Sequence, residues 1–528
     1  MTLSDSVEQS LWDTAERLRG SVEASEYKHI VLGILFLQDA NHKYEQRRDE
    51  LEILLDDPDA PPEYYCESDA DRDAKLTDPG LYAQAGAAYI PDKARWDYLI
   101  SHARTVDNVS ELLDDALAGI ERENADRLEG KLPTKRYQRA NINNDKLASV
   151  LEEFDDLTDR SEDTDADFLG RVYEYFVREF AIEEAQSDGA FYTPGNVVRL
   201  LVEILRPLDG MRVFDPCCGS GGMFVESQKF AEEGEPDAAI SFIGQELNKS
   251  TVHLAEMNMF LHGLDADIHH GDSLYDDQFP DTKADRVITN PPFNYSWDNT
   301  KHGVANDDRF PYGIPGNENA NFAFIQHMLA HLEDGGIVGT VMANGALSST
   351  QNNEGGIRKA IVDDDLLDAV ITLPKKLFYS TQIPSSIWVF SKGKGTHSDD
   401  DSRERQGETM FIDAEDMFEK VSRSQNRLSS DHITTVADAV RAYRGDADTD
   451  DYEDVPGFCK VATIEDIAEN DYNVNPGRYV GLAESGEERV PLSVKLPELY
   501  AELDAQFQRA HGLQTEIQDN LDKVMANE

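Results

Sequence analysis

The sequence contains little cysteine and no apolar run long enough to cross a membrane. Its four cysteines are Cys66, Cys217, Cys218 and Cys459. No pair has the spacing of metal ligands, and so few thiols do not make a disulfide framework, which favours a reducing compartment such as the cytoplasm. The longest apolar stretch, Ile30 to Leu37, is too short to span a bilayer. The N-terminus has no basic segment followed by an apolar core, so we expect neither a signal peptide nor a membrane protein.

Basic residues are also scarce. Lysine and arginine together number 49, against 104 aspartate and glutamate residues, and the formal net charge is −55. The acidic excess is spread along the whole chain, a composition that resembles the proteins of salt-loving archaea. Such a surface repels nucleic acid at low ionic strength, but high salt shortens the reach of that repulsion to about 3 Å. The charge therefore does not exclude DNA as a partner, because local basic contacts can still decide binding.

The length of 528 residues predicts two to four domains. Residues 1–158 have helical spacing of apolar side chains and predict an all-helical domain that faces DNA or a partner. Residues 168–395 alternate short apolar strands with helices, which predicts a doubly wound α/β sheet. Residues 396–485 are mixed and acidic, and we expect them to complete that domain. Residues 490–528 predict a C-terminal helix whose apolar stripe a partner helix would cover during subunit assembly.

The α/β region offers short apolar segments that we expect to be strands. They cover residues 212–214, 240–245, 266–268, 286–289, 336–342, 366–372 and 386–390. In a doubly wound sheet, ligands bind in the crevice beyond the carboxyl ends of the strands. The residues that directly follow these strands are therefore the candidates for a functional site.

The segment Asn290-Pro291-Pro292-Phe293 follows the strand at 286–289. Two prolines fix φ and remove two backbone donors, so the loop is stiff and its polar groups are mainly acceptors. The Asn290 side-chain oxygen and neighbouring carbonyls, beside the flat face of Phe293, suit a planar group that carries an –NH2. Taken alone, such a segment is more often simply a turn that ends a strand.

A glycine-rich turn follows the strand at 212–214. Asp215 stands at the strand end, and Gly219, Ser220, Gly221 and Gly222 lead into a helix. Glycines allow a ligand to approach the backbone closely. The N–H groups at a helix start favour an anion, but an aspartate before the glycines would repel a phosphate. Asp215 instead favours a cationic ligand, such as the amino and sulfonium groups of S-adenosyl-L-methionine.

Two further carboxylates follow strands. Glu246 ends the strand at 240–245, where a carboxylate can accept hydrogen bonds from both hydroxyls of a ribose. Asp272 follows the strand at 266–268 and could accept from the exocyclic amine of a bound adenine. Either residue alone could also be a solvated strand end.

The segment Phe191-Tyr192-Thr193-Pro194 precedes the first strand and a helix. Thr193 is predicted to be the N-cap of that helix, with Pro194 at its first position. The functional alternative is that these residues close over the methionine end of the cofactor.

The order of these motifs resembles that of the gamma-class amino-methyltransferases that act on adenine in DNA. More narrowly, the chain resembles the modification subunit of type I restriction-modification systems. The resemblance extends to residues 319–328, 342–347, 382–388 and 471–479, and it departs from the family at the vicinal pair Cys217-Cys218. It implies a Rossmann-like S-adenosylmethionine-dependent methyltransferase fold, double-stranded DNA as the substrate, and a target adenine flipped out of the helix.

The resemblance also implies roles for the residues. Asn290 and the Pro291 carbonyl would accept the two N–H groups of the adenine N6 amine, and Phe293 would stack on the flipped base. Phe191 to Pro194, Asp215, Gly219 to Gly222, Glu246 and Asp272 would bind the cofactor. No metal is expected.

The chain has no evident duplicated recognition domain after Phe390. As in type I systems, sequence specificity would then come from a separate subunit, flanked by two modification subunits and joined by a restriction subunit in the full complex. Two alternatives are a protein glutamine N5-methyltransferase, which uses a similar loop but lacks the segment before the first strand, and a catalytically silent DNA-binding or assembly subunit. A fused nuclease is disfavoured by the length.

One stretch of the chain is basic, although the chain as a whole is acidic. Lys131, Lys135, Arg136 and Arg139 surround Tyr137. They could contact phosphate or a partner subunit, or they could simply be the solvated flank of a helix.

Overall fold

The computed structural model describes most of the chain. The described ranges are 5–18, 24–159, 168–188, 192–301, 303–378, 383–395, 403–446 and 451–482, with Tyr500, Asp504, Gln506 and Arg509. The chain divides into two units, Met1–Val480 and Gly481–Glu528. The predicted helix at 490–528 lies almost entirely outside the described residues, as does Phe191. Within the described residues, no helix is both long and apolar enough to cross a membrane.

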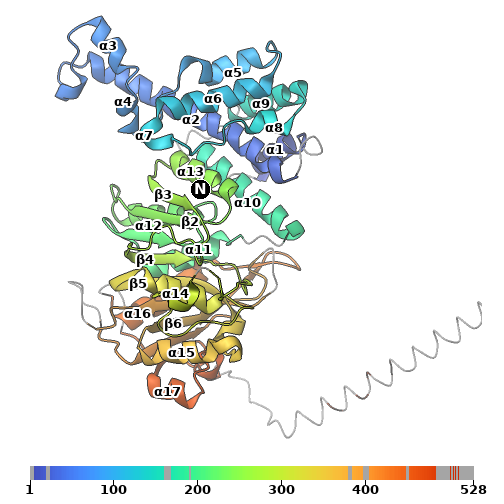
Figure 1. The fold of residues 1–528 in the computed structure, drawn as a ribbon, viewed down its shortest axis with the longest axis vertical. Helices are drawn as coiled ribbons and strands as arrows, with labels where there is room; N and C mark the ends of the chain where they lie inside the picture. Colours follow the sequence, from blue (N-terminus) through green and yellow to red (C-terminus); the bar gives the residue numbers. More distant parts are fainter. Residues whose placement is uncertain are drawn as a thin grey trace, which may run out of the picture. The chain divides into compact units, whose positions relative to one another are not determined.

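The N-terminal region is helical, as predicted (Figure 1). Its helices are α1 (Asp5–Glu16), α2 (Ala24–Asp56), α3 (Asp69–Lys75), α4 (Pro79–Ala83), α5 (Trp96–Ala103), α6 (Val109–Glu123), α7 (Ala125–Leu128), α8 (Arg136–Ala140), α9 (Asn144–Asp159) and α10 (Phe168–Asp188). Helix α2 extends over 33 residues, from Ala24 to Asp56. Residues 29 to 41 of α2 are buried on every side, which is why no amphipathic pattern marks the helix end.

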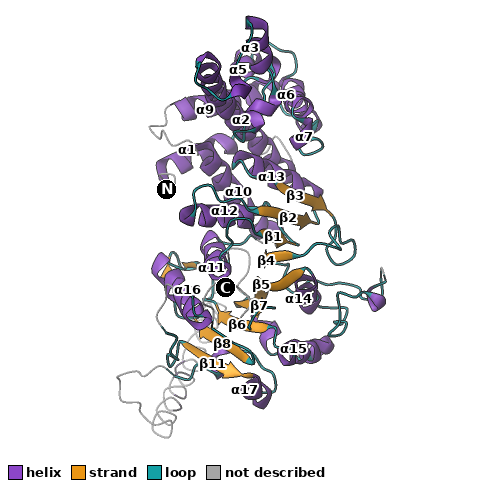
Figure 2. Cartoon of the chain, turned by 90° about the vertical axis from the view of Figure 1, so that its left-hand side faces the viewer, coloured by secondary structure: helices purple, strands orange, loops and turns teal. Residues whose placement is uncertain are grey.

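A single large sheet follows (Figure 2). Its strands are β1 (Arg212–Asp215), β2 (Ser241–Glu246), β3 (Ala266–His270), β4 (Ala284–Thr289), β5 (Leu332–Ala343), β6 (Leu367–Thr372), β7 (Ser385–Ser391), β8 (Glu408–Asp413) and β11 (Cys459–Thr463). The spatial order is β11-β8-β6-β7-β5-β4-β1-β2-β3. The neighbours from β3 to β5 are parallel, whereas β7 runs antiparallel to both β5 and β6. Strands β6 and β7 are buried along their whole length, as expected for strands covered on both faces.

Helices cover both faces of the sheet. Figure 2 shows α11 (Gly195–Leu205), α12 (Gly222–Gly234) and α16 (Ser430–Arg444) on one face, and α14 (Asn321–Ala330) and α15 (Glu354–Asp363) on the other. Helix α13 (Lys249–Leu261) shares its apolar side chains Leu254, Met257, Phe260 and Leu261 with the core of the N-terminal helices. Residues after β7 add β8, β11, α17 (Ile464–Glu469) and a hairpin of β9 (Glu419–Lys420) and β10 (Asn426–Arg427). The predicted α/β class is confirmed.

Candidate active site

The carboxyl ends of β1 and β4 border a cavity of about 690 Å³. The sequence-predicted residues that line it are Tyr192, Thr193, Pro194, Asp215, Gly219, Ser220, Gly222 and Asn290. Segments almost a hundred residues apart in the chain therefore meet at one site. Gly221, Glu246, Asp272, Pro291, Pro292 and Phe293 are not among the residues that line this cavity, although each is adjacent in the chain or hydrogen-bonded to one that does or follows a neighbouring strand of the same sheet edge.

Asp215 is a buried carboxylate at the edge of this cavity. Its side chain is 2% exposed, and Oδ1 accepts the Cys217 N–H at 2.9 Å. Burial raises the pKa of Asp215 to about 7, and repulsion from Glu246 adds to the rise. A cation placed beside this carboxyl would stabilise its charged form.

The glycine-rich turn holds an unusual backbone. Gly219 and Gly221 have φ values of +55° and +79°, in the left-handed region, and a Cβ on Gly221 would lie 2.7 Å from Met259 Cε. The Gly219 N–H donates to Glu246 Oε2 at 3.2 Å, and the Asn248 N–H donates to Glu246 Oε1 at 2.8 Å. Through these hydrogen bonds, Glu246 connects the turn after β1 to the end of β2. Each of its oxygens keeps a further lone pair for another donor.

Three carboxylates surround Cys217. Burial, with repulsion from Asp215, Glu246 and Asp272, raises the pKa of the Cys217 thiol well above its ordinary value. The raised pKa keeps this thiol protonated and unreactive. The Asp272 side chain accepts the Leu274 N–H at 3.0 Å, which shapes the turn after β3. The carboxylates predicted at three strand ends thus converge, although only Asp215 reaches the cavity itself.

Asn290 presents a lone acceptor. Its Nδ2 donates to Thr193 Oγ1 at 2.8 Å, while its Oδ1 is buried and has no hydrogen-bond partner among the residues that the structure describes. A buried polar atom without a partner costs about 1–3 kcal/mol, so it marks a site where an outside donor is expected. The Asn290 side chain is therefore oriented by the hydrogen bond from Nδ2, and its Oδ1 can accept a hydrogen bond from a ligand.

The prediction that Thr193 caps a helix is wrong. Helix α11 begins one residue later than expected, at Gly195, and Pro194 occupies the N-cap position without a side-chain cap bond. The Thr193 hydroxyl is instead used to hold Asn290. The Thr-Pro pattern in the sequence suggests that the hydroxyl caps a helix. The hydrogen-bond partner that the hydroxyl has in the structure lies 97 residues away, so no neighbouring residue indicates it.

Phe293 lies behind the loop. Its side chain is 7% exposed and packs edge-on against Phe378, with ring centroids 6.0 Å apart. Pro291 is also buried. The aromatic ring therefore supports the loop from the core side, and Leu377, next to Phe378, reaches the cavity wall.

Sequence reasoning missed part of the cavity wall. Helix α10 contributes Arg171, Tyr175 and Arg178, α13 contributes Asn258, and the β9–β10 hairpin contributes Gln425, Asn426 and Arg427. Asn258 Nδ2 donates to Ser220 O at 2.9 Å, which fixes the glycine-rich turn. Asn426 donates from its backbone N–H to Lys376 O and from Nδ2 to Lys375 O, both at 2.9 Å. No local sequence pattern marks these residues as part of a site, because they reach the cavity through contacts between distant segments.

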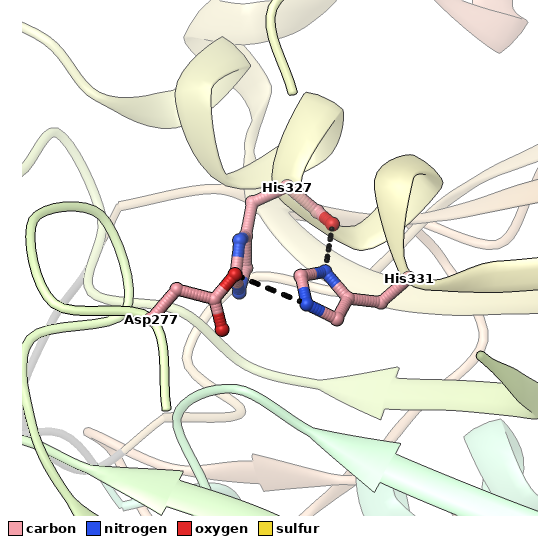
Figure 3. A group of neighbouring side chains, drawn as sticks. All are labelled: Asp277, His327 and His331. Carbon is pink, nitrogen blue, oxygen red and sulfur yellow. Dashed lines mark hydrogen bonds and ion pairs between the residues drawn. The ribbon is translucent and has the colours of Figure 1, made fainter. Parts of the chain in front are cut away.

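A cluster of one carboxylate and two histidines lies near the loop that carries Asp272. Asp277, His327 and His331 point toward one another and lie close enough to hold a metal ion (Figure 3). Arg309 Nη1, however, donates to His327 Nδ1 at 2.9 Å and lies 3.4 Å from Asp277 Oδ2. With that lone pair engaged, His327 Nε2 must carry the ring proton, because burial lowers the pKa of His327 and keeps the ring neutral.

The same arginine explains what the cluster does. Arg309 donates to Ser273 O at 2.7 Å and to Leu274 O at 2.8 Å, and His331 Nε2 lies 3.2 Å from Asp277 Oδ2. The guanidinium thus balances the Asp277 charge and ties the turn after Asp272 to α14. We assign this cluster to the architecture of the site.

The reversed β7 between β5 and β6, together with the Asp215 and glycine-rich turn after β1, defines an S-adenosylmethionine-dependent methyltransferase. The cavity volume and the buried Asp215 fit this cofactor, which carries two positive charges next to an adenosine. The chain belongs to the N-6 DNA methylase family, whose model matches residues 164–488. A second model, the HsdM N-terminal domain, matches residues 7–154.

Named relatives agree with the family. The chain is 36% identical to the type I restriction enzyme MjaIX methylase subunit of Methanocaldococcus jannaschii, over 99% of this chain and 92% of that one. It is 39% identical to the HindI methylase subunit of Haemophilus influenzae, over 82% of this chain and 99% of that one. The crystal structure of a type I methyltransferase subunit from Streptococcus thermophilus superposes with a TM-score of 0.71 at 28% identity, covering 90% of this chain and 99% of that one.

The family, the class of fold and the cofactor predicted from the sequence are confirmed. The protein is an S-adenosylmethionine-dependent DNA methyltransferase that modifies the N6 amine of adenine.

Proposed function

We propose that the segment Asn290 to Phe293 is the catalytic loop of this enzyme and receives an adenine flipped out of duplex DNA. The observation that carries the proposal is the Asn290 amide, whose Nδ2 is held by Thr193 and whose buried Oδ1 has no partner among the described residues. This oxygen belongs to a residue that lines the same cavity as Asp215. A target base inside the helix is out of reach of any such pocket, so flipping is required.

The chemistry assigned to the loop is orientation. The lone pair of the adenine N6 is delocalised into the ring and is a poor nucleophile. Asn290 Oδ1 and the Pro291 carbonyl would each accept one N–H, which draws the nitrogen toward tetrahedral geometry and frees its lone pair. Acceptors held rigid before the reaction stabilise the transition state without any reorganisation. Pro291 and Pro292 supply that rigidity.

The cofactor residues have separable tasks. When bound, S-adenosylmethionine supplies a methyl group on a sulfonium. Asp215 would hold the positive charges of the cofactor. The glycine-rich turn, with its left-handed backbone, would let the cofactor approach the main chain closely. Glu246 would accept from the ribose hydroxyls, Asp272 from the adenine amine, and Tyr192 to Pro194 would cover the methionine end.

We also propose that this enzyme is the modification subunit of a type I complex. Full-length similarity to type I restriction enzyme methylase subunits supports this assignment. A specificity subunit would choose the sequence, two copies of this chain would flank it, and a restriction subunit would join the full complex. DNA incubated with labelled S-adenosylmethionine should be methylated at defined sites only when the specificity subunit is present. Equal, site-specific methylation by this chain alone would contradict the division of labour.

Thr193→Val tests whether Thr193 positions Asn290. Loss of one oriented hydrogen bond of about 1–1.5 kcal/mol should lower kcat about tenfold, with little change in the KM for cofactor. Thr193→Ser keeps the hydroxyl and should restore kcat. A purely structural role would instead lower thermal stability in both variants, or change KM and kcat together.

Cofactor affinity should depend on pH. Because the pKa of Asp215 in the free enzyme is about 7, this carboxyl is partly protonated at neutral pH, and a bound cation favours its charged form. Binding therefore releases a proton, and the dissociation constant should rise about tenfold per pH unit as the pH falls below 7. Calorimetric titrations between pH 5.5 and 8.5 measure this slope. An Asp215→Asn enzyme with the same slope would assign it to another group.

A further inference from the structure

A second cavity, of about 590 Å³, lies between the N-terminal helices and the start of α13. Its lining residues are Glu121, Gly130, Leu132, Pro133, Thr134, Arg136, Arg139, Ala140, Lys249 and His253. Lys249 is the first residue of α13 and follows the end of β2 by only a short turn, so this cavity opens near the carboxyl edge of the sheet. None of its residues lines the cofactor cavity.

The cavity is basic although the chain is strongly acidic. Arg136, Arg139 and Lys249 line it with a single carboxylate, Glu121, which accepts the Gly130 N–H. Arg139 and Lys249 are exposed, and neither forms an ion pair with any residue in the described part of the chain. The cavity therefore concentrates positive charge in a protein with about twice as many acidic as basic residues.

The arginines are held in place before any ligand arrives. Tyr137, between them, is 1% exposed and donates from its hydroxyl to Ile30 O at 3.0 Å. The Asp114 carboxylate accepts the N–H groups of Tyr137 and Gln138 at 3.1 and 3.0 Å, which caps α8. Tyr137 is therefore a core anchor, and α8 is a fixed platform for Arg136 and Arg139.

Burial and the positive charge of the cavity lower the pKa values of two neighbouring histidines. Burial lowers the pKa of His253, and repulsion from Arg136 and Lys249 lowers it further. Burial lowers the pKa of His29 to about 2, again with a contribution from Arg136. Lys131, by contrast, is engaged with Glu256 at 3.0 Å and is not available to a ligand.

We propose that this cavity is a phosphate-binding site in which Arg139 and Lys249 hold the anion, with Arg136 on the same wall. A guanidinium fork and an ammonium group together supply several charged donors to the oxygens of a phosphate. The phosphate belongs either to the backbone of DNA or to a free phosphorylated molecule. Contacts this close act within the screening distance, so an acidic enzyme can make them in concentrated salt.

The test compares two double variants with the same change of charge. Arg139→Gln/Lys249→Gln removes two cations from the cavity, whereas Lys93→Gln/Arg122→Gln removes two exposed cations outside it. Anisotropy of a labelled random-sequence duplex, measured against the full-length protein across a salt series, reports phosphate contacts through the slope of log K against log salt. Calorimetry with inorganic phosphate reports binding of a free anion. S-adenosylmethionine affinity shows that each variant is folded.

Each result has a defined meaning. If DNA supplies the phosphate, the cavity variant should lose about two units of slope, near 0.9 for each lost contact, and the control should lose none. If a free phosphate is the ligand, the cavity variant should lose inorganic phosphate binding alone. Wild-type behaviour of the cavity variant in both assays would overturn the proposal. Asn290→Ala should bind both probes normally, so failure of the catalytic assignment would leave this site intact.

Discussion

Asn290→Ala is expected to lower methyl transfer at least about 1,000-fold while leaving the dissociation constant for S-adenosylmethionine nearly unchanged. Loss of one preorganised group at a reacting centre costs about 100- to 1,000-fold in kcat, and this variant also loses the orienting bond to Thr193. Asn290 lines the cavity but contributes no charge to it, so the cofactor should bind as before. Single-turnover transfer of labelled methyl, beside calorimetric cofactor binding, separates the two effects.

Asn108→Ala is the matched control for Asn290→Ala. Asn108 caps α6 by accepting the Glu111 N–H at 3.3 Å, and its loss should cost about 1 kcal/mol of stability without touching the cavity. If both variants lose activity equally, the effect at Asn290 is one of stability. Near wild-type turnover by Asn290→Ala would remove the loop from the mechanism.

Asp215→Ala is expected to weaken cofactor binding about 100-fold. The carboxylate is the one buried acid that lines the cavity beside the glycine-rich turn, and truncating one partner of a buried charge pair costs about 2–5 kcal/mol. Equilibrium titration with S-adenosylmethionine measures the loss, and titration with the uncharged-sulfur product S-adenosylhomocysteine shows how much of it arises from the sulfonium.

Asp237→Ala supplies the control for Asp215→Ala. Asp237 is an exposed acid in the turn before β2, and its removal changes the net charge by the same amount. It should bind cofactor like the wild type. Unchanged affinity in Asp215→Ala would show that the cation is held elsewhere on the cavity wall, where the other lining acids are Glu8, Glu174 and Glu226.

The parts of the site that could be predicted are those whose residues belong to, or directly follow, a recognisable local sequence pattern. Asp215 and Glu246 end strands, and Asn290 follows one directly, so the strand pattern alone placed all three at one edge of the sheet. The glycine-rich turn could also be predicted from the sequence, because Gly219 and Gly221 adopt backbone angles that other residues rarely take.

The parts that could not be predicted depend on contacts between distant segments. Thr193 looked like a helix cap because its hydroxyl has a local alternative, whereas its actual partner is Asn290. The β9–β10 hairpin is held at the cavity by hydrogen bonds from Asn426 to the loop at Lys375 and Lys376 and from Lys376 to Arg423. Tyr137 looked like part of a basic surface, but its ring is in the core and only the flanking arginines face the second cavity.

The measurement that tests the central claim most directly is the identity of the methylated base. DNA incubated with the enzyme, its specificity subunit and isotope-labelled S-adenosylmethionine is digested to nucleosides and examined by mass spectrometry. The wild-type enzyme should give labelled N6-methyl-2′-deoxyadenosine, and Asn290→Ala should give none. Labelled N4-methyl-2′-deoxycytidine, label found only in protein glutamine, or equal N6-methyl-2′-deoxyadenosine from both enzymes would contradict the assignment.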